Sequence, residues 1–517
     1  MPAKIFSATV NGLDAQIIEV EVDVSYGLRC FDIVGLPDKS VQESKERVSS
    51  AIKNSNFNSP HKQAQRILVS LAPADLKKEG SLYDLPIALG YLGASKQIKI
   101  NSQEKIIIGE LALDGRLRPV KGVISLALAA REKGWKEIIL PKDNAKEAAL
   151  VSNIKEKEPL SNKVKIIGVE SLRQAIDYLE GREKIDSFET DITNILEKLD
   201  NSIDFSWIKG QASAKRAMEI TAAGGHHLMM QGPPGTGKSL LAKALSSILP
   251  NLSFQESLEV TKIYSIAGLL SKDKPFMSYR PFRSPHHTSS SSALIGGGNP
   301  VKAGEITLAH RGILFLDEFP EFHRDVLESL REPLENGTIA ILRAKESLTL
   351  PARFTLVAAA NPCPCGHYQD PVKACTCSYA QVAKYRRKLS GPLIDRIDIF
   401  ANVPQVEFER LVSPNEENSS LATKNRVEQA REIQKQRFAT TKNFVNAEMD
   451  IPQIKKYCEI DAKSKNALKH FIDSGELSAR GYHRILKTAK TIADLDGSES
   501  ISFDNLTEAL MYRTKES

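Results

Sequence analysis

Residues 232–239, Gly-Pro-Pro-Gly-Thr-Gly-Lys-Ser, decide the fold of this 517-residue chain. They match the phosphate-loop pattern G-x-x-x-x-G-K-[ST] at every fixed position. Residues 226–231 before the loop predict a strand, and the apolar periodicity of residues 240–249 predicts a helix, which is the context that the pattern needs. The segment therefore predicts a nucleotide phosphate site in an α/β domain. The residues expected to bind the nucleotide are Gly232, Gly235, Thr236, Gly237, Lys238 and Ser239.

The chemistry of this loop predicts ATP and Mg²⁺ as cofactors. Glycines let the backbone curl so that its N–H groups face phosphate oxygens. Lys238 is expected to reach the β- and γ-phosphates, and the Ser239 hydroxyl to ligate Mg²⁺. An ordinary glycine-rich turn is the alternative, which the full match in the right context disfavours.

Two carboxylates follow a predicted buried strand further along the chain. Residues 313–316 are all apolar, and Asp317 and Glu318 come directly after them. Asp317 is expected to hold the magnesium ion and Glu318 to polarise the attacking water. A third apolar strand, residues 354–360, ends at Asn361. That amide either orients the lytic water or forms a simple turn before the next proline.

Four regions follow one another along the chain. The first mixes strands with helices: residues 19–24 alternate as a strand does, and residues 40–54 place Val41 and Val48 on one helical face. A polar, mostly acidic stretch follows and predicts a linker. Alternating strands and helices then predict a parallel α/β sheet, and the last region shows mainly helical stripes. These regions are residues 1–180, 181–204, 205–405 and 406–517.

Composition excludes several classes of protein. Hydrophobic residues make up 41% and charged residues 26% of the chain, which argues against wholesale disorder. The longest nearly uncharged apolar stretch, residues 85–94, is about half of what a bilayer crossing needs. No secretory leader opens the sequence, so we expect a cytoplasmic protein without a membrane partner. The net charge of +6 is too small to identify a nucleic-acid partner.

Four of the six cysteines form a local C-x-C-x9-C-x-C cluster directly after Asn361. Four thiolates suit a closed tetrahedral zinc site, which would staple an irregular loop. Four reduced thiols are the alternative, and a disulfide is disfavoured without an export signal. Zinc and reduced thiols both remain open at this point. The four residues are Cys363, Cys365, Cys375 and Cys377.

With these motifs in place, the chain resembles the ComM/YifB-type family of magnesium-chelatase-like AAA+ ATPases along nearly its whole length. The segments that carry the resemblance are residues 35–37, 280–287, 296–298, 304–306, 314–319, 361–366 and 390–398. The resemblance implies an α/β multidomain fold. Its parts are a Lon-protease-like α+β N-terminal domain (1–180), an AAA+ P-loop α/β core (205–405) and a C-terminal helical lid domain (406–517).

The resemblance also implies a homo-oligomeric ring, usually a hexamer, with ATP bound between subunits. Arg396 would then project into a neighbour's site as an arginine finger, a role that suits a permanently charged, forked guanidinium. A salt bridge with Asp395 or Asp398 is the alternative. Arg480 matches the second sensor of the lid domain, and Arg484 competes for that role if the alignment is one turn off.

A hairpin is predicted over residues 337–350, before the strand that ends at Asn361. In related rings this hairpin points into the central pore, which would place Arg343 and Lys345 near a threaded DNA backbone. Positive side chains suit phosphate contacts that read no bases. A solvated basic face is the alternative.

The likeness of the first domain to Lon proteases does not extend to their catalytic residues. Leu82 stands at the position of the nucleophilic serine and Ile124 at that of the lysine. A hydroxyl nucleophile needs an adjacent base, which neither residue supplies. Ser81 and Lys121 lie close by in sequence, so a shifted dyad stays open. We expect this domain to be a non-proteolytic assembly or DNA-handling module.

Three functions follow from these features. The leading hypothesis is an ATP-driven motor on single-stranded or branched DNA, since the chain resembles a family that promotes branch migration during natural transformation. The second is a protein-remodelling subunit like the one that drives magnesium insertion into a porphyrin. The third, an ATP-dependent protease, is disfavoured by the residues at its catalytic positions.

Overall fold

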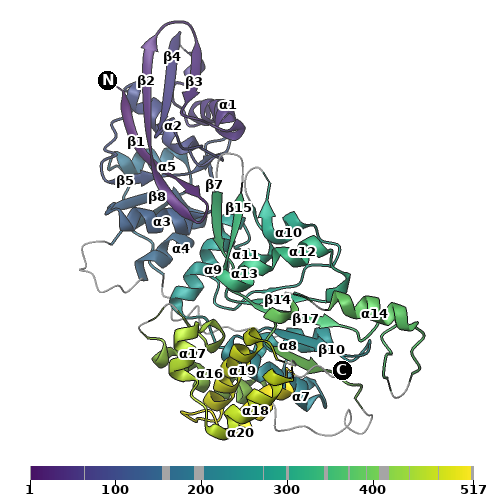
Figure 1. The fold of residues 1–517 in the computed structure, drawn as a ribbon. Helices are drawn as coiled ribbons and strands as arrows, with labels where there is room; N and C mark the ends of the chain where they lie inside the picture. Colours follow the sequence, from purple (N-terminus) through teal and green to yellow (C-terminus); the bar gives the residue numbers. More distant parts are fainter. Residues whose placement is uncertain are drawn as a thin grey trace. The chain divides into compact units, whose positions relative to one another are not determined.

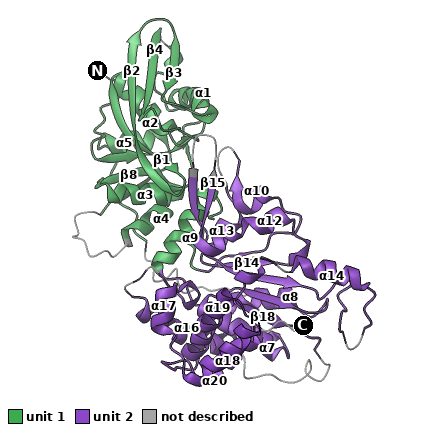
Figure 2. Cartoon of the chain, viewed as in Figure 1, with its two compact units in different colours: residues 1–198, 254–278, 299–302 green, residues 199–253, 279–298, 303–517 purple. Residues whose placement is uncertain are grey.

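The computed structural model describes residues 2–513 apart from 63, 154–162, 191–202, 272, 299–301, 343–346, 371–372, 390, 392, 407–418, 440, 442 and 475–476. The chain forms two compact units (Figure 2). Unit 1 comprises residues 1–198, 254–278 and 299–302, and unit 2 comprises residues 199–253, 279–298 and 303–517. Residues 254–278 thus cluster with the N-terminal region, although they lie within the segment 205–405 that the sequence predicts as one core.

Unit 1 is built on a seven-stranded mixed sheet in the order β3-β4-β2-β1-β5-β8-β9 (Figure 1). β2 pairs antiparallel with both β1 and β4, whereas β5, β8 and β9 run parallel to β1. The strands are β1 (Ala3–Asn11), β2 (Asp14–Tyr26), β3 (Cys30–Val34), β4 (Gln65–Ala72), β5 (Lys105–Ile107), β8 (Glu137–Pro141) and β9 (Lys165–Val169).

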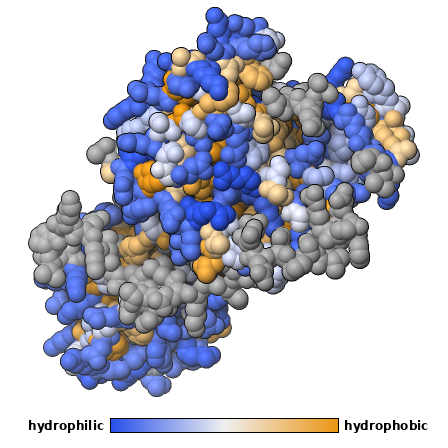
Figure 3. All heavy atoms as spheres, turned by 90° about the horizontal axis from the view of Figure 1, so that it is seen from below, coloured by the Kyte–Doolittle hydropathy of each residue, from blue (hydrophilic) through white to orange (hydrophobic). Residues whose placement is uncertain are grey.

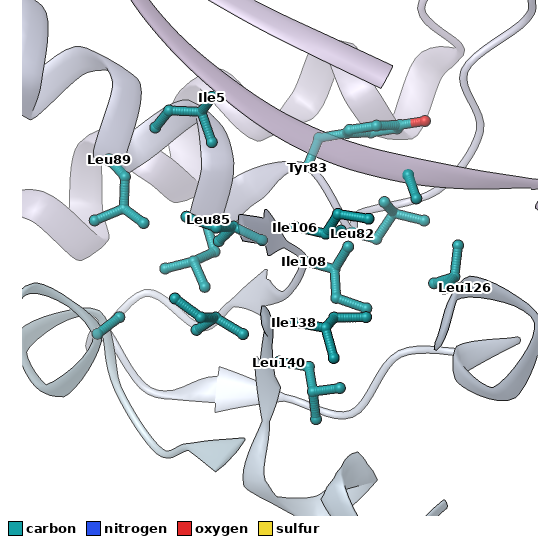
Figure 4. Close-up of a cluster of buried hydrophobic side chains, with 14 of the residues drawn as sticks. Ile5, Leu82, Tyr83, Leu85, Leu89, Ile106, Ile108, Leu126, Ile138 and Leu140 are labelled. Carbon is teal, nitrogen blue, oxygen red and sulfur yellow. The ribbon is translucent and has the colours of Figure 1, made fainter. Parts of the chain in front are cut away.

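Helices pack on this sheet and bury one apolar core. Figure 4 shows Leu82, Leu85, Ile106, Ile108 and Ile138 converging in it, and all five are buried. The helices are α1 (Lys39–Asn54), α2 (Asp84–Ala94), α3 (Val123–Glu132), α4 (Lys142–Ala149), α5 (Leu172–Leu179) and α9 (Phe254–Ala267), with the short helices η1 (Pro60–Lys62) and η2 (Leu150–Asn153). A two-stranded ribbon, β6 (Glu110–Leu111) with β7 (Leu117–Arg118), completes the unit.

Sequence periodicity correctly predicts several of these elements. The alternating residues 19–24 lie in β2, where Val20 and Val22 are buried. Helix α1 begins after Asp38, whose carboxylate accepts a hydrogen bond from the backbone N–H of Val41 and caps the first turn. The buried face of α1 includes Val48, as the predicted stripe requires.

Unit 2 contains a five-stranded sheet in the order β11-β14-β17-β10-β18. Every neighbouring pair in it is parallel. The strands are β11 (Phe282–Arg283), β14 (Ile313–Leu316), β17 (Thr355–Ala360), β10 (Leu228–Gln231) and β18 (Ile399–Asn402). The sequence prediction of a parallel α/β sheet for this region is confirmed.

The other elements of the α/β region of unit 2 include the predicted hairpin. Its strands, β15 (Thr338–Leu342) and β16 (Ser347–Pro351), pair antiparallel, but Arg343 and Lys345 lie outside the described residues. The helices are α7 (Ala212–Gly224), α8 (Lys238–Ile248), α10 (Ser291–Ile295), α11 (Glu305–Leu308), α12 (Arg324–Ser329), α13 (Arg331–Asn336) and α14 (Tyr379–Lys388). Shorter elements are η4 (Phe205–Trp207), β12 (Gly296–Gly297), β13 (Lys302–Ala303), η5 (Phe319–Glu321) and η6 (Ile394–Arg396).

The C-terminal part of unit 2 is helical, as the stripes in the sequence predict. Figure 1 shows these helices gathered beside α7, and both α16 and α19 contact α7. A buried network joins them: the Arg437 guanidinium forms two hydrogen bonds with the Asp494 carboxylate, and the amide of Asn446 donates to the same carboxylate at 2.7 Å. The elements are α16 (Ser420–Arg437), η7 (Asn446–Glu448), α17 (Ile451–Tyr457), α18 (Ala462–Asp473), α19 (Ala479–Leu495) and α20 (Phe503–Met511).

None of the helices in the part of the chain that the structure describes is both long and apolar enough to cross a bilayer. The face drawn in Figure 3 is mostly hydrophilic, and its apolar side chains occur in small groups between polar ones.

A buried ion pair gives the first testable prediction. In unit 1 the fully buried carboxylate of Asp84 binds Arg47 through both oxygens, at 2.7 Å to Nε and 3.0 Å to Nη2. Asp84→Ala should lower the free energy of unfolding of this unit by about 3 kcal/mol, because a largely buried guanidinium loses its counter-charge. Asp114→Ala, which removes an exposed pair with Arg116, should leave it nearly unchanged. The free energy of unfolding of unit 1 is measured for both variants by denaturant titration, with hydrogen exchange at unit 1 amides as the readout. Equal destabilisation by the two substitutions would refute the prediction.

Candidate functional site

The candidate site lies at the edge of the unit 2 sheet where its parallel strands end. Because parallel strands share a direction, the residues that follow them meet at the same edge. The phosphate loop follows β10, Asp317 and Glu318 follow β14, and Asn361 follows β17. The structure therefore brings the predicted loop, acids and amide together.

The loop has the backbone of a phosphate cradle. Gly235 and Gly237 adopt positive φ angles of +79° and +84°, and no atom lies within 4 Å of where a Cβ would stand on either residue. Gly232 is needed for another reason, since its Cβ would lie 2.1 Å from the carbonyl oxygen of Val403. The Thr236 hydroxyl donates to the Pro233 carbonyl at 3.0 Å and closes the turn. Open space above a left-handed glycine loop fits a bound phosphate chain.

Lys238 begins helix α8 and points its ammonium group into this loop. Its Nζ donates to the carbonyl oxygens of Gly232 and Pro233, both at 2.8 Å, and to Oδ1 of Asn361 at 3.2 Å. Burial lowers the pKa of Lys238, and the nearby Asp317 carboxylate opposes that shift. Lys238 and Asn361, which the sequence assigns to the site from separate motifs, thus lie in direct contact.

The magnesium ligands expected from the sequence also meet. The Ser239 hydroxyl donates to Oδ2 of Asp317 at 2.6 Å. A hydroxyl and a carboxylate at this distance are suitable donors for one Mg²⁺ ion that is otherwise held by water and phosphate oxygens. Glu318 has a φ of +51°, and 56% of its side chain is exposed. The carboxylate is thus available to a water molecule in front of the loop.

Sequence reasoning missed one residue of this site. His287 Nδ1 lies 2.9 Å from Oε2 of Glu318. The motifs found in the sequence point to neither His286 nor His287 as part of this site. The missed signal is that both histidines follow β11, which is parallel to β14, so their side chains reach the same sheet edge as Glu318.

Arg396 lies at the opposite edge of the sheet. It precedes β18, whose first residue, Ile399, pairs with the first residue of β10, so Arg396 lies near the amino ends of these strands. Only 7% of Arg396 is exposed, and its guanidinium forms an ion pair with Glu335. The sequence offered a salt bridge with Asp395 or Asp398 as the alternative to the finger role, whereas the ion pair in the structure is with Glu335.

Arg480 and Arg484 lie on the same side as Arg396. A pocket is lined by Glu335, Arg396, Arg480 and Arg484, together with His483 and Lys487. Arg480 is exposed, whereas the guanidinium of Arg484 pairs with Asp398.

Asp398 anchors this edge to the C-terminal helices. It accepts a hydrogen bond from the backbone N–H of His227 at 3.0 Å and lies 3.6 Å from the ring of His226. Burial alone would raise the pKa of Asp398, but Arg484 and the two rings hold it well below its usual range. Burial lowers the pKa of His227 to about 4, so this ring is neutral at physiological pH.

The four clustered cysteines meet in one place next to Asn361. Their sulfur atoms all lie within 4.8 Å of one another. Backbone hydrogen bonds from His367 and Thr376 lower the pKa of the Cys365 thiol to about 5.

The positions that correspond to a Lon-type dyad are buried apolar residues. Ile124 is fully buried and Leu82 is 9% exposed, both in the unit 1 core. Ser81 donates its hydroxyl proton to the Glu110 carboxylate, and Lys121 is exposed beside Gly268. A hydroxyl bound to a carboxylate is not paired with a lysine base, so this geometry offers no nucleophile of the Ser–Lys kind.

Three family models match successive parts of the chain. "Magnesium chelatase, subunit ChlI" matches residues 204–411, "Subunit ChlI of Mg-chelatase" matches residues 20–144, and "Magnesium chelatase, subunit ChlI C-terminal" matches residues 417–513. Together they cover the phosphate loop, both carboxylates, Asn361 and both candidate sensor arginines.

Curated relatives match over the whole length. The chain is 43% identical over 508 residues to YifB of Escherichia coli K12, covering 97% of this chain and 95% of that protein. It is 41% identical over 519 residues to the competence protein ComM of Haemophilus influenzae, covering 99% and 97%. A local match, 28% over 206 residues, links 40% of this chain to a fifth of the DNA helicase MCM8 of Bos taurus. The chain therefore belongs to the ComM/YifB-type family of magnesium-chelatase-like proteins.

Proposed function

We propose that this protein hydrolyses ATP at the edge formed by β10, β14 and β17 and uses the energy to move DNA. The contact of Lys238 with Asn361, beside the Ser239–Asp317 pair, carries the ATPase proposal. Bound MgATP would supply the phosphoryl group that is transferred to water. Hydrolysis then depends on positioning and on charge stabilisation rather than on covalent work by the protein.

Each residue of the site has a distinct task in this scheme. The glycine loop would hold the phosphate oxygens through its backbone N–H groups, and Lys238 would neutralise developing charge on them. Ser239 and Asp317 would hold the magnesium ion. Glu318 would accept a proton from the attacking water, and Asn361 would orient that water.

The DNA part of the proposal comes from the relatives. A competence protein matches 99% of this chain, and a DNA helicase matches 40% of it. We infer a motor on single-stranded or branched DNA that promotes branch migration while incoming strands are integrated. Arg343 and Lys345, on the hairpin between β15 and β16, remain the proposed backbone contacts.

We propose that identical subunits assemble into a hexameric ring, which would place each ATP between two subunits.

The position of Arg396 supports such an arrangement. It stands across the sheet from its own phosphate loop, and β18 alone spans about 13 Å at roughly 3.3 Å per residue. Arg396 and the exposed Arg480 line one pocket, so a head-to-tail neighbour would present its phosphates to both. We propose that Arg396 is the finger and Arg480 the second sensor for that neighbour.

A protein-remodelling role remains the second candidate, because all three matching family models are those of a magnesium chelatase subunit. The two functions differ in the molecule that stimulates ATP turnover. DNA stimulates ATP turnover by a DNA motor, whereas a remodelling subunit responds to its protein partner.

Lys238→Ala tests the ATPase proposal. It should lower ATP turnover at least about 100-fold, because the phosphates would lose the positive charge that Lys238 presents from the start of α8. It should also abolish strand displacement on a forked DNA substrate. Lys243→Ala, which removes an exposed lysine five residues further along α8, is the matched control and should keep both activities. If wild-type turnover is insensitive to forked DNA, the motor proposal fails and the remodelling role gains support.

His287→Ala tests whether His287 positions Glu318. We expect kcat to fall about tenfold with little change in KM, because the carboxylate loses the partner that fixes its orientation. His287→Gln, which keeps a hydrogen-bond donor, should recover part of the loss. His286 instead contacts Thr288 at 2.9 Å, so His286→Ala should leave kcat nearly unchanged. A wild-type kcat in His287→Ala would contradict the assignment.

Mixing two inactive variants tests whether Arg396 serves a neighbour. Glu318→Gln and Arg396→Ala should each be inactive alone. In an equal mixture, about one quarter of the interfaces would join an intact Glu318 to an intact Arg396, so about a quarter of the wild-type turnover should return. If Arg396 served its own subunit, no site in the mixture would be complete and activity would stay absent.

A further inference from the structure

The loop between β17 and α14 brings four sulfur atoms together outside the catalytic residues. Sγ of Cys363 lies 3.4 Å from that of Cys365 and 3.7 Å from that of Cys375, and the latter two are 3.6 Å apart. Cys377 completes the group, and its sulfur accepts a hydrogen bond from the backbone N–H of Cys365 at 3.4 Å. The chain thus folds two C-x-C pairs onto each other.

These distances fit a shared metal ion better than they fit a disulfide or independent thiols. A disulfide would bring two sulfurs to about 2.05 Å and separate them from the other pair. Four sulfurs placed about 2.3 Å from a zinc ion at the corners of a tetrahedron lie about 3.8 Å apart, close to the observed spacings. A backbone N–H that donates to one of the sulfurs is the outer-shell support such ligands need.

We propose that Cys363, Cys365, Cys375 and Cys377 hold one zinc ion in a closed tetrahedral site. All four donors are thiolates, so no coordination position is left for water or substrate, and the role of the metal is structural. The ion would join the end of β17 to the start of α14, because Cys363 follows Asn361 closely and Cys377 precedes the helix cap Ser378.

The loop that carries the four cysteines, residues 361–378, packs against the phosphate loop. Gly366 has a φ of +85°, and a Cβ there would lie 2.5 Å from Cδ of Pro234. On the same loop, Asn361 contacts Lys238, and Tyr385 of α14 is buried beside the backbone of Asn361. Fixing the four sulfurs would therefore fix both the amide and one wall of the phosphate cradle. This second step rests on the proposed ATPase function, whereas the metal site itself does not.

Metal analysis of the purified full-length protein tests the site directly. We expect about one zinc ion per chain, and replacement by cobalt should give the visible absorption of a tetrahedral thiolate complex. Absence of zinc after expression in zinc-supplemented medium, together with no such cobalt spectrum, would overturn the proposal. This measurement needs no variant and no ATPase activity.

Substitutions locate the metal and test its link to the nucleotide. The Cys375→Ser variant should lose most of its bound zinc. The Cys377→His variant should retain zinc, because imidazole is also a zinc ligand. Cys30 is an exposed thiol in unit 1, so Cys30→Ser should leave the zinc content unchanged. Binding of a fluorescent ATP analogue should weaken about tenfold in Cys375→Ser and recover in Cys377→His. Full zinc content in Cys375→Ser would overturn the site even if that variant binds nucleotide poorly.

The two proposals fail separately in these experiments. A protein that holds zinc but hydrolyses no ATP keeps the metal site and refutes the proposed function. A protein that hydrolyses ATP, contains no zinc and gives no cobalt spectrum keeps the function and refutes the metal site. Full zinc content in the wild-type protein, together with unchanged nucleotide affinity in a Cys375→Ser variant that has lost its zinc, would refute the link between them.

Discussion

Parallel pairing of the strands β11, β14, β17, β10 and β18 is the constraint on which the candidate site depends. Parallel strands need a crossover between them, so both faces of the sheet are covered and its strands become runs of apolar residues. The same pairing brings together residues that are far apart in sequence. His287, the Asp317–Glu318 pair, Asn361 and the phosphate loop each follow a different strand, and they meet because those strands end at one edge.

The same constraint keeps other charged residues away from that edge. Asp398 and Arg396 precede β18, so they lie with the amino ends of the strands. There Asp398 binds Arg484 of α19 and the backbone of His227, which ties the C-terminal helices to the sheet. Under the proposed function, the phosphate loop at one edge and the arginines at the other could act on the same phosphate only if they came from different copies of the chain. Head-to-tail stacking of copies would bring the two edges together.

The features of the fold and of the candidate site that could be predicted from the sequence are those that depend on residues close together in the chain. The phosphate loop, Asp317 and Asn361 were predictable because a few adjacent residues carry both the turn and the functional group. Helix α1 and strand β2 were predictable from periodicity alone. The pairing of His287 with Glu318, and of Arg396 with Glu335, depends on strand order and on packing between distant segments. The membership of α9 in unit 1 was also beyond reach, because an amphipathic pattern does not specify which core the helix joins.

The cysteine loop extends the order of the sheet into a segment that has little regular structure. β17 is held on both sides by β14 and β10, so the chain is fixed as far as Ala360. Beyond it, positive φ angles at Gly366 and Gln369 mark a winding path without strand pairing. Such a segment gains little from backbone hydrogen bonds or an apolar core, and in the proposed zinc site a cluster of thiolates around one ion would replace both. Because Asn361 lies between the fixed strand and this loop, its contact with Lys238 is only as well defined as the loop that follows it.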